Sequence, residues 1–237
     1  MRFRDYKLEK PRIKYWTQGE YDECVRRDFL DDRTTLLRDG GLFCLSLHGI
    51  ECPRHWTKAE YNEKVELGFL CKQGVFLYRG ELVEMPVMSY LHARCCQRIN
   101  YWLFDTFQSE EFEIRIRCPF EVPGESMPEP DGALVTPIQL KRRPHPNAAA
   151  LIVEVSEESS QMERERAFDY AAALVPDYWI INGYAREIEI YRNPVADQLS
   201  GTGFKYSSHL IANESDGLSP LARPEAIVKV AELVATK

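Results

Sequence analysis

The spacing of apolar and polar residues from about residue 75 onward predicts a mixed α/β domain. In residues 111–122, apolar side chains alternate with charged ones, which is typical of a half-buried strand. In residues 89–107, apolar side chains recur at intervals of three and four residues, as an amphipathic helix requires. Residues 151–155 are apolar except for Glu154, a pattern typical of a central strand buried on both faces.

The other patterns complete an α/β fold with a mixed sheet and flanking helices. Turns that contain glycine or proline separate the remaining runs and mark the ends of elements. We predict a hairpin at 75–85 that turns at Gly80, a strand entered within 128–135, a helix at 160–175 that stops before Pro176, strands at 178–182 and 187–192 joined through Asn182 and Gly183, a strand at 204–211 and a closing helix at 224–235.

Two segments near the N-terminus are similar at an offset of forty residues. WTQGEYDECVRRDFL (16–30) and WTKAEYNEKVELGFL (56–70) are identical at eight of fifteen positions, which is far more than chance gives. Each segment predicts a helix opened by an N-capping threonine and followed by a short hairpin. We therefore predict a duplicated helix-hairpin extension, with the first copy in residues 1–54 and the main domain in residues 55–237. Its expected role is structural, either to cover the core or to make a dimer contact.

Composition narrows the function by exclusion. The chain is 44% apolar and 28% charged, and it has neither an apolar stretch of membrane-spanning length nor an apolar signal region behind its basic N-terminus, so we expect a cytoplasmic protein with no membrane partner. The seven cysteines never have CxxC spacing, which weighs against a zinc site or a disulfide framework. The net charge of −7 gives no overall attraction for phosphates, so local patches must hold any nucleic acid. The loop KRRPHP (141–146) is the best candidate for phosphate contacts, with a solvated turn as the alternative.

Glu154 needs an explanation, because an uncompensated carboxylate in a buried strand is costly. One solution is a divalent cation shared with Asp131, a second carboxylate that enters a separate strand within PEPDGALV. Oxygen ligands of this kind suit Mg²⁺ or Mn²⁺ better than Zn²⁺. The other solution is a structural ion pair with an arginine. The candidate partners are Arg115, Arg117, Arg164 and Arg166.

An ordered series of motifs connects this chain to a known family. PEPDGALV (128–135), LIVEVSEES (151–159), the Glu-Arg pair of the following helix and VPDYWIIN (175–182) occur in this order. With them the sequence resembles the Uma-two family of restriction-endonuclease-like proteins, part of the PD-(D/E)XK nuclease superfamily, over about residues 55 to 236. The resemblance implies a restriction-endonuclease-like core in which Asp131 and Glu154 jointly bind Mg²⁺. It also implies the backbone carbonyl of Val155 as a third ligand.

The positively charged residue of the implied site departs from the family pattern. The family lysine stands on the following helix, one turn before a tyrosine that matches Tyr170, and this chain has Arg166 there. Arginine keeps the charge and can stabilise a phosphorane-like transition state, but it loses its proton far less readily than lysine. The resemblance therefore implies a charge-stabilising role for Arg166, supported by Arg164, and not that of a general base.

Supporting contacts are also implied by the resemblance. Glu84 is kept within GELVEM, whereas Phe76 stands where family members carry a glutamate shortly before the Gly-Glu dipeptide. His92 matches a family histidine, which can orient a phosphate or a carboxylate, and a purely structural role is its alternative.

Two functions from different classes remain. The first is a Mg²⁺- or Mn²⁺-dependent endonuclease that hydrolyses phosphodiester bonds of nucleic acid, with DNA favoured, and in which Asp131 and Glu154 hold the ion. The second is a degenerate relative that binds nucleic acid or a protein partner without cutting, with Arg166 paired to Glu154. Metal dependence separates the two. A homodimer would let two such sites cut two strands.

Overall fold

The computed structural model describes residues 12–46, 50–70, 74–85, 87–107, 111–137, 145–156 and 160–235. The chain divides into two compact units, the first comprising Met1–Val87 with Gly124–Met127 and the second Met88–Pro123 with Pro128–Lys237. Both similar N-terminal segments lie within the first unit, which extends to Val87. No helix within the described ranges is long and apolar enough to cross a membrane.

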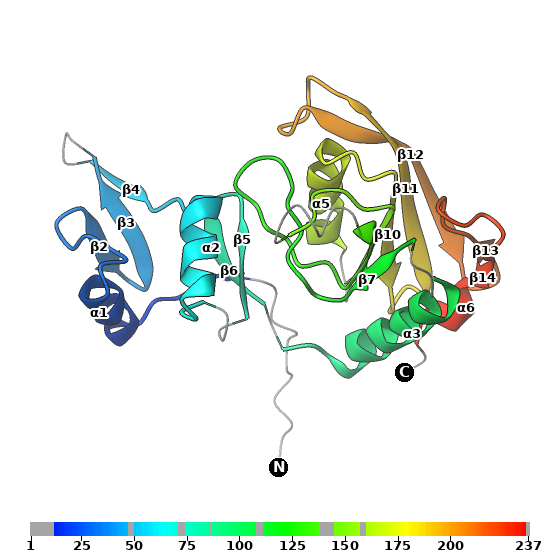
Figure 1. The fold of residues 1–237 in the computed structure, drawn as a ribbon, viewed down its shortest axis with the longest axis horizontal. Helices are drawn as coiled ribbons and strands as arrows, with labels where there is room; N and C mark the ends of the chain where they lie inside the picture. The colour runs from blue at the N-terminus through cyan, green and yellow to red at the C-terminus, as the bar shows by residue number, and fades with distance from the viewer. Residues whose placement is uncertain are drawn as a thin grey trace, which may run out of the picture. The chain divides into compact units, whose positions relative to one another are not determined.

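A mixed sheet forms the centre of the second unit (Figure 1). In the described part of the chain its strand order is β12-β11-β10-β9-β8-β7, and only β9 and β10 run parallel to each other. The strands are β7 Glu113–Arg115, β8 Gly132–Val135, β9 Leu151–Ser156, β10 Asp177–Asn182, β11 Glu187–Ala196 and β12 Phe204–Asn213. The parallel pair needs a crossover connection, which helix α5 (Gln161–Ala172) supplies. The predicted α/β fold with a mixed sheet is confirmed.

The two faces of β9 meet different helices. Leu151, Val153 and Val155 pack in one apolar cluster with helix α3 (Tyr90–Thr106), because alternate residues of a strand point to the same face. Ile152 packs instead in a second cluster, with side chains of α5. Glu154 shares the face of Ile152, so its carboxylate is directed toward α5.

The strand predicted at residues 111–122 is shorter than expected. Only Glu113–Arg115 forms a strand, because Arg117 has a positive φ of 48° and breaks the extended backbone. The residues after β7 still run beside the residues before β8, since the Arg117 N–H donates to the Pro130 carbonyl at 2.9 Å. These contacts fix the backbone immediately before Asp131.

The closing helix predicted at residues 224–235 is also shorter than expected. Helix α6 covers only Val230–Leu233. The preceding residues Val228–Lys229 form β14, which pairs with β13 (Gly217–Leu218), so backbone pairing replaces the expected first turns of the helix.

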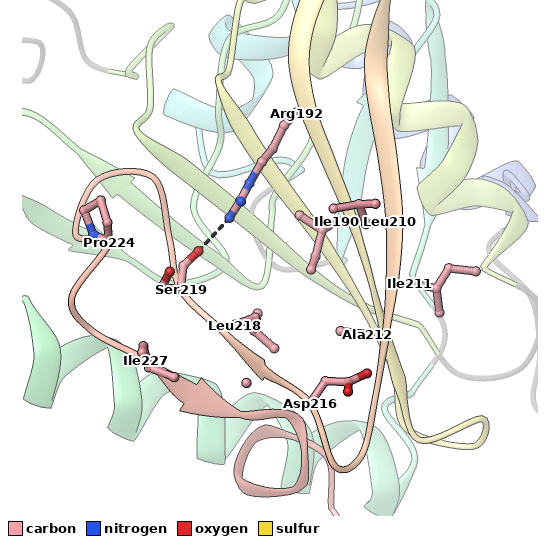
Figure 2. Close-up of a pocket in the computed structure, with 11 residues that line it drawn as sticks. Ile190, Arg192, Leu210, Ile211, Ala212, Asp216, Leu218, Ser219, Pro224 and Ile227 are labelled. Carbon is pink, nitrogen blue, oxygen red and sulfur yellow. Dashed lines mark hydrogen bonds between the residues drawn. The ribbon is translucent and has the colours of Figure 1, made fainter.

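A pocket of about 540 Å³ lies beside β11 and β12 (Figure 2). Arg192 enters it from β11 and donates to the Ser219 carbonyl at 2.6 Å, as the dashed line shows. Apolar side chains form most of the lining: Ile190, Leu210, Ile211, Ala212, Leu218, Pro224 and Ile227. Glu154, Ile180 and Glu189 are aligned across β9, β10 and β11, so their side chains lie on one face of the sheet. Ile190 and Arg192 lie on the other face, because successive side chains of a strand point to opposite faces. The pocket is therefore on the opposite face of the sheet from Glu154.

The first unit contains the two similar segments, each with a helix followed by a hairpin. The first segment and the residues that follow it form α1 Gln18–Arg26, β2 Thr35–Arg38 and β3 Gly41–Leu45, and the second segment and its following residues form α2 Lys58–Glu66, β5 Val75–Tyr78 and β6 Glu81–Glu84. Two short strands extend these hairpins: β4 (Glu51–Pro53) pairs with β3, and β1 (Arg12–Ile13) pairs with β6.

The two segments make equivalent contacts. The N–H of Trp16 donates to the Gly40 carbonyl at 2.9 Å, and the N–H of Trp56 donates to the Gly80 carbonyl at 2.7 Å. Both glycines have a φ of 79°, a conformation in which a side chain would be strained. The two indole rings stack on each other with centroids 6.0 Å apart and an interplanar angle of 10°. Like positions of the two segments thus meet at the centre of the unit.

Loss of either helix cap is expected to destabilise the first unit to a similar extent. The side chains of Thr17 and Thr57 each accept a hydrogen bond from the glutamate three residues later and so close a capping box. Thr17→Ala and Thr57→Ala should each lower the free energy of unfolding by about 1 kcal/mol. Urea denaturation followed by tryptophan fluorescence measures this loss. The exposed Thr34→Ala is the control and should stay within about 0.5 kcal/mol; an equal loss in all three variants would contradict the capping role.

Candidate active site

Asp131 is held in place by the backbone of the neighbouring strand. The pairing of β8 with β9 ends at Gly132 and Val153, so the next N–H of β9 on the side of β8 belongs to Val155. That N–H donates to Asp131 Oδ2 at 2.9 Å. Nε2 of His92 lies 3.3 Å from the other carboxylate oxygen, Oδ1, and the Asp131 side chain is 8% exposed. The Asp131 carboxylate therefore accepts the hydrogen bond that a backbone carbonyl would accept if β8 continued to pair with β9.

Glu154 is compensated by two side chains of α5. Its Oε1 accepts a hydrogen bond from Arg166 Nη1 at 2.9 Å and another from the Tyr170 hydroxyl at 2.7 Å. Arg166 and Tyr170 are four residues apart, so they present their side chains on one face of the helix. The ion pair is almost fully buried, with both side chains at most 4% exposed. Of the four arginines considered from the sequence, Arg166 is the one that the structure places on Glu154.

The surroundings shift the pKa values of the two carboxyl groups in opposite directions. Burial raises the pKa of Glu154 to about 7, and the charge of Asp131 adds to this effect, while Arg166 and Tyr170 oppose it. Burial acts in the same direction on Asp131, but His92 and the Val155 N–H hold the pKa of that carboxyl below its usual value. Asp131 is therefore the more strongly ionised acid of the pair.

Two further acids belong to the electrostatic surroundings of Asp131 and Glu154. Glu129 lies two residues before Asp131, and Glu163 lies in the first turn of α5. Burial raises the pKa of both; the charge of Asp131 raises that of Glu163 further, whereas Arg166 lowers both. Neither residue was predicted as a site residue, although Glu129 stands inside PEPD (128–131) and Glu163 directly precedes Arg164. Clustered carboxylates of this kind favour a bound cation.

His92 and Cys96 approach Asp131 from α3. They are four residues apart and so share one face of this helix, whose N-terminus is capped by Ser89 through its bond from the His92 N–H at 3.1 Å. The Cys96 thiol lies beside Asp131, and burial together with the charge of that carboxylate raises the pKa of the thiol. One ligand atom from each of His92, Cys96 and Asp131 lies within 4.8 Å of the others, so the group could hold a metal ion. The absence of CxxC spacing in the sequence argued against such a group. The His-x₃-Cys spacing within a predicted helix is the signal that could have indicated it.

The ligands implied for Mg²⁺ fit a hard divalent ion. Asp131 accepts one hydrogen bond on each oxygen from His92 and Val155, which leaves further lone pairs. Glu154 Oε2 makes no hydrogen bond to any residue that the structure describes. The carbonyl of Val155 points to the same side of β9 as its N–H, toward Asp131. These three residues together offer oxygen atoms only, as Mg²⁺ prefers.

Other residues considered from the sequence lie elsewhere. Arg164 donates three hydrogen bonds of 2.7 to 3.1 Å to the buried Glu189 and not to Glu154. Glu84 belongs to the first unit, where Arg12 and Lys14 pair with it, and Phe76 is buried in that unit. The basic residues 141–143 of the KRRPHP loop lie outside the described residues.

Taken together, the mixed sheet and its paired buried acids define a restriction-endonuclease-like protein. A family model described as "Putative restriction endonuclease" matches residues 72–222. This match spans more than half of the chain, and the protein belongs to the Uma2 family.

A solved structure supports the fold independently. The chain is similar to a protein from Anabaena variabilis ATCC 29413 described as "a putative nuclease belonging to DUF820", with a TM-score of 0.54 and 12% sequence identity. The similarity covers 68% of this chain and 90% of that one. At this identity the likeness shows the fold alone. No curated protein matches the chain.

Removing the Arg166 cation is expected to destabilise the second unit strongly. Arg166→Met leaves the buried Glu154 without the positive charge that pairs with it, so the free energy of unfolding should fall by about 3–5 kcal/mol. Adding Glu154→Gln should recover most of that loss, a coupling of about 2 kcal/mol or more. Urea denaturation in the presence of a chelator measures both. Lys205→Met, which removes a half-exposed pair with Asp197, is the control and should cost at most about 1 kcal/mol; additive losses in the double variant would contradict the pairing.

The cluster around Glu189 is expected to make the fold acid-sensitive. Burial would raise the pKa of Glu189, but hydrogen bonds from Arg164 and Tyr191 hold it below its usual value. A depressed pKa contributes stability that is present above the unfolded value of about 4.3 and is lost as the pH falls through the folded value. Glu189→Gln should therefore lose less stability than the wild type when the pH is lowered below about 4.3. Thermal unfolding across this range is the measurement, with Glu187→Gln on the same strand as control; parallel curves for both variants and the wild type would contradict the assignment.

Proposed function

We propose that this protein is a Mg²⁺- or Mn²⁺-dependent endonuclease that hydrolyses phosphodiester bonds of nucleic acid, with DNA as its substrate. The observation that carries the proposal is the presence of two buried carboxylates at neighbouring strands, Asp131 immediately before β8 and Glu154 in β9, with the charge of Asp131 raising the pKa of Glu154. Membership of the Uma2 family supports the same class of reaction. Asp131, Glu154 and the Val155 carbonyl would hold the ion.

The residues around the two acids would position them for this role. The Val155 N–H and His92 fix the Asp131 carboxylate, and Tyr170 and Arg166 fix one oxygen of Glu154. When bound, a divalent ion would supply neutralisation of the charge that develops on the phosphate. His92 and Tyr170 act through the carboxylates and are therefore positioning residues.

Arg166 would contribute fixed positive charge. Its contact with Glu154 keeps the guanidinium beside the acid pair, and the charge of Glu154 raises its pKa against the effect of burial, so it stays protonated. A proton acceptor has to come from elsewhere, because arginine does not give up its proton under these conditions. Arg166 thus suits the stabilisation of charge on the phosphate or its leaving group.

Arg117 is a further candidate for binding the phosphate. Its charge lowers the pKa of both Asp131 and Glu129, so it acts on the same site, and its side chain is only half-buried. With a net charge of −7, the chain depends on such local cations to bind a polyanion. A homodimer would place two such sites on the two strands of a duplex.

One observation favours a second function. The Arg166–Glu154 pair already compensates the buried acid, so Glu154 does not require a metal ion as its counter-charge. A protein with this arrangement could bind nucleic acid or a protein partner without cutting. Metal-dependent cleavage distinguishes the two functions.

Substitution of either acid is expected to abolish cleavage. With Mg²⁺ or Mn²⁺ the wild type should nick supercoiled plasmid, and Asp131→Asn or Glu154→Gln should lower the rate by at least about a hundredfold, equivalent to about 2.7 kcal/mol. Asp105→Asn changes an exposed acid on α3 and should retain the wild-type rate. A chelator should stop the wild type completely.

The same experiment decides against the proposal if no cleavage occurs. Absence of nicking with either metal, combined with an unfolding temperature that neither metal changes, would leave the non-cutting function. Cleavage that survives in both acid variants would indicate a contaminating nuclease or a different site.

A further inference from the structure

We propose that His92, Cys96 and Asp131 form a site for a borderline-soft divalent ion of the Zn²⁺ class, and that occupation of this site excludes Mg²⁺ from the acid pair. The part about exclusion rests on the proposed function, because Asp131 is shared by both sites. The part about Zn²⁺ binding stands on the three side chains alone.

The distances suit a small tetrahedral ion. In a zinc site with bonds of about 2.0–2.3 Å, neighbouring ligand atoms lie roughly 3.3–3.8 Å apart. His92 Nε2 and Asp131 Oδ1 already lie 3.3 Å apart, and the three ligand atoms all lie within 4.8 Å of one another. Only a small movement of the Cys96 side chain is needed to complete three protein ligands, with the fourth position left for water.

The two helical ligands are held on a rigid element. His92 and Cys96 occupy one face of α3, while Cys95 and Ile99 on the adjoining face are buried in the core against β9. The Val155 N–H holds the Oδ2 atom of Asp131 and leaves Oδ1 toward the histidine. Such outer hydrogen bonds orient a ligand before the ion arrives.

The chemistry of the ligands selects the ion. A thiolate and an imidazole favour Zn²⁺ or Co²⁺ over Mg²⁺, which prefers oxygen ligands and octahedral geometry. On binding, the S–H bond of Cys96 breaks, its proton passes to water and a sulfur–metal bond forms. Neutral His92, the Cys96 thiolate and the Asp131 carboxylate then balance the two positive charges of the ion, as a buried site requires.

The exclusion follows from the sharing of Asp131. A Zn²⁺ ion on Oδ1 would take electron density from the carboxylate that Mg²⁺ needs, and two divalent ions beside one another would repel. Zn²⁺ would therefore act as an inhibitor that competes with Mg²⁺. Glu154 belongs to the Mg²⁺ ligands only, so its substitution should spare the Zn²⁺ site.

The first test uses Co²⁺ as a spectroscopic substitute for Zn²⁺ in the full chain. The wild type should show a sulfur-to-cobalt charge-transfer band in the near ultraviolet that saturates at one equivalent and disappears when Zn²⁺ is added. Cys96→Ser should lose the band, whereas Cys118→Ser, which changes another partly buried cysteine of the same unit, and Glu154→Gln should keep it. No band in the wild type, or a band that survives in Cys96→Ser, would overturn the proposal.

Competition with a chromophoric chelator then measures affinity. Cys96→Ser and His92→Gln should each lower the affinity for Zn²⁺ by about tenfold or more. If Cys96→Ser fails to fold, as judged by circular dichroism, His92→Gln and the wild-type spectrum decide the question, and unchanged affinity in His92→Gln would contradict the site.

The exclusion has its own measurement, independent of cleavage. Excess Mg²⁺ should displace Co²⁺ from the wild type and reduce the charge-transfer band, but it should do so much less in Glu154→Gln. If the protein cleaves plasmid, Cys96→Ser should need at least about tenfold more Zn²⁺ for half-inhibition of its own Mg²⁺-supported rate. A normal cobalt band with no effect of Mg²⁺ would reject the exclusion and keep the metal site, whereas failure of cleavage alone would bear only on the proposed nuclease function.

Discussion

The buried contact of Arg166 with Glu154 determines how the second unit is assembled. Glu154 lies in β9 and Arg166 in α5, the helix that connects β9 to its parallel neighbour β10. The contact therefore ties this connecting helix to the strand that precedes it. A buried pair of this kind contributes little net stability over apolar residues of similar shape, but a lone charge in its place is strongly unfavourable. The contact therefore specifies the register of α5 on the sheet more than it adds to stability. Tyr170, which bonds to the same oxygen, reinforces that register.

Two positive charges would compete for the acid pair Asp131 and Glu154: the guanidinium of Arg166 and a cation that enters the site. Arg166 occupies one oxygen of Glu154, while Asp131 accepts from the Val155 N–H and lies beside His92 and Cys96. The asymmetry means that a cation entering the site meets one acid already neutralised and another still available. In both proposals Asp131 would be the anchor for the metal ion, and its partners, oxygen ligands on β9 or nitrogen and sulfur ligands on α3, would decide which ion is held.

Much of the second unit could be predicted from the sequence because its elements repeat simple periods. The buried run of β9, the amphipathic α3 and the stop before Pro176 each depend on local patterns, and they lie where those patterns indicated. The sequence indicated that Glu154 needs a partner, but it left four arginines as candidates. The packing of α5 on the sheet brings Arg166 to Glu154, and this packing could not be predicted from the spacing. The ends of elements failed where non-local pairing prevailed, as at Val228–Lys229. The grouping of Cys96 with Asp131 could not be predicted, because these two residues lie far apart in the sequence and only the packing of α3 brings them together.

The stacked tryptophans of the first unit make it resemble two subunits joined by a tether. In a true dimer, dilution separates the partners, whereas here Trp16 and Trp56 stay at a fixed effective concentration set by the chain that joins them, an offset of forty residues. The contact can therefore be small and still persist. It also means that one segment is free to change away from the shared Trp, Thr and Gly positions, as the replacement of GELVEM by GGLFCL shows, without loss of its counterpart.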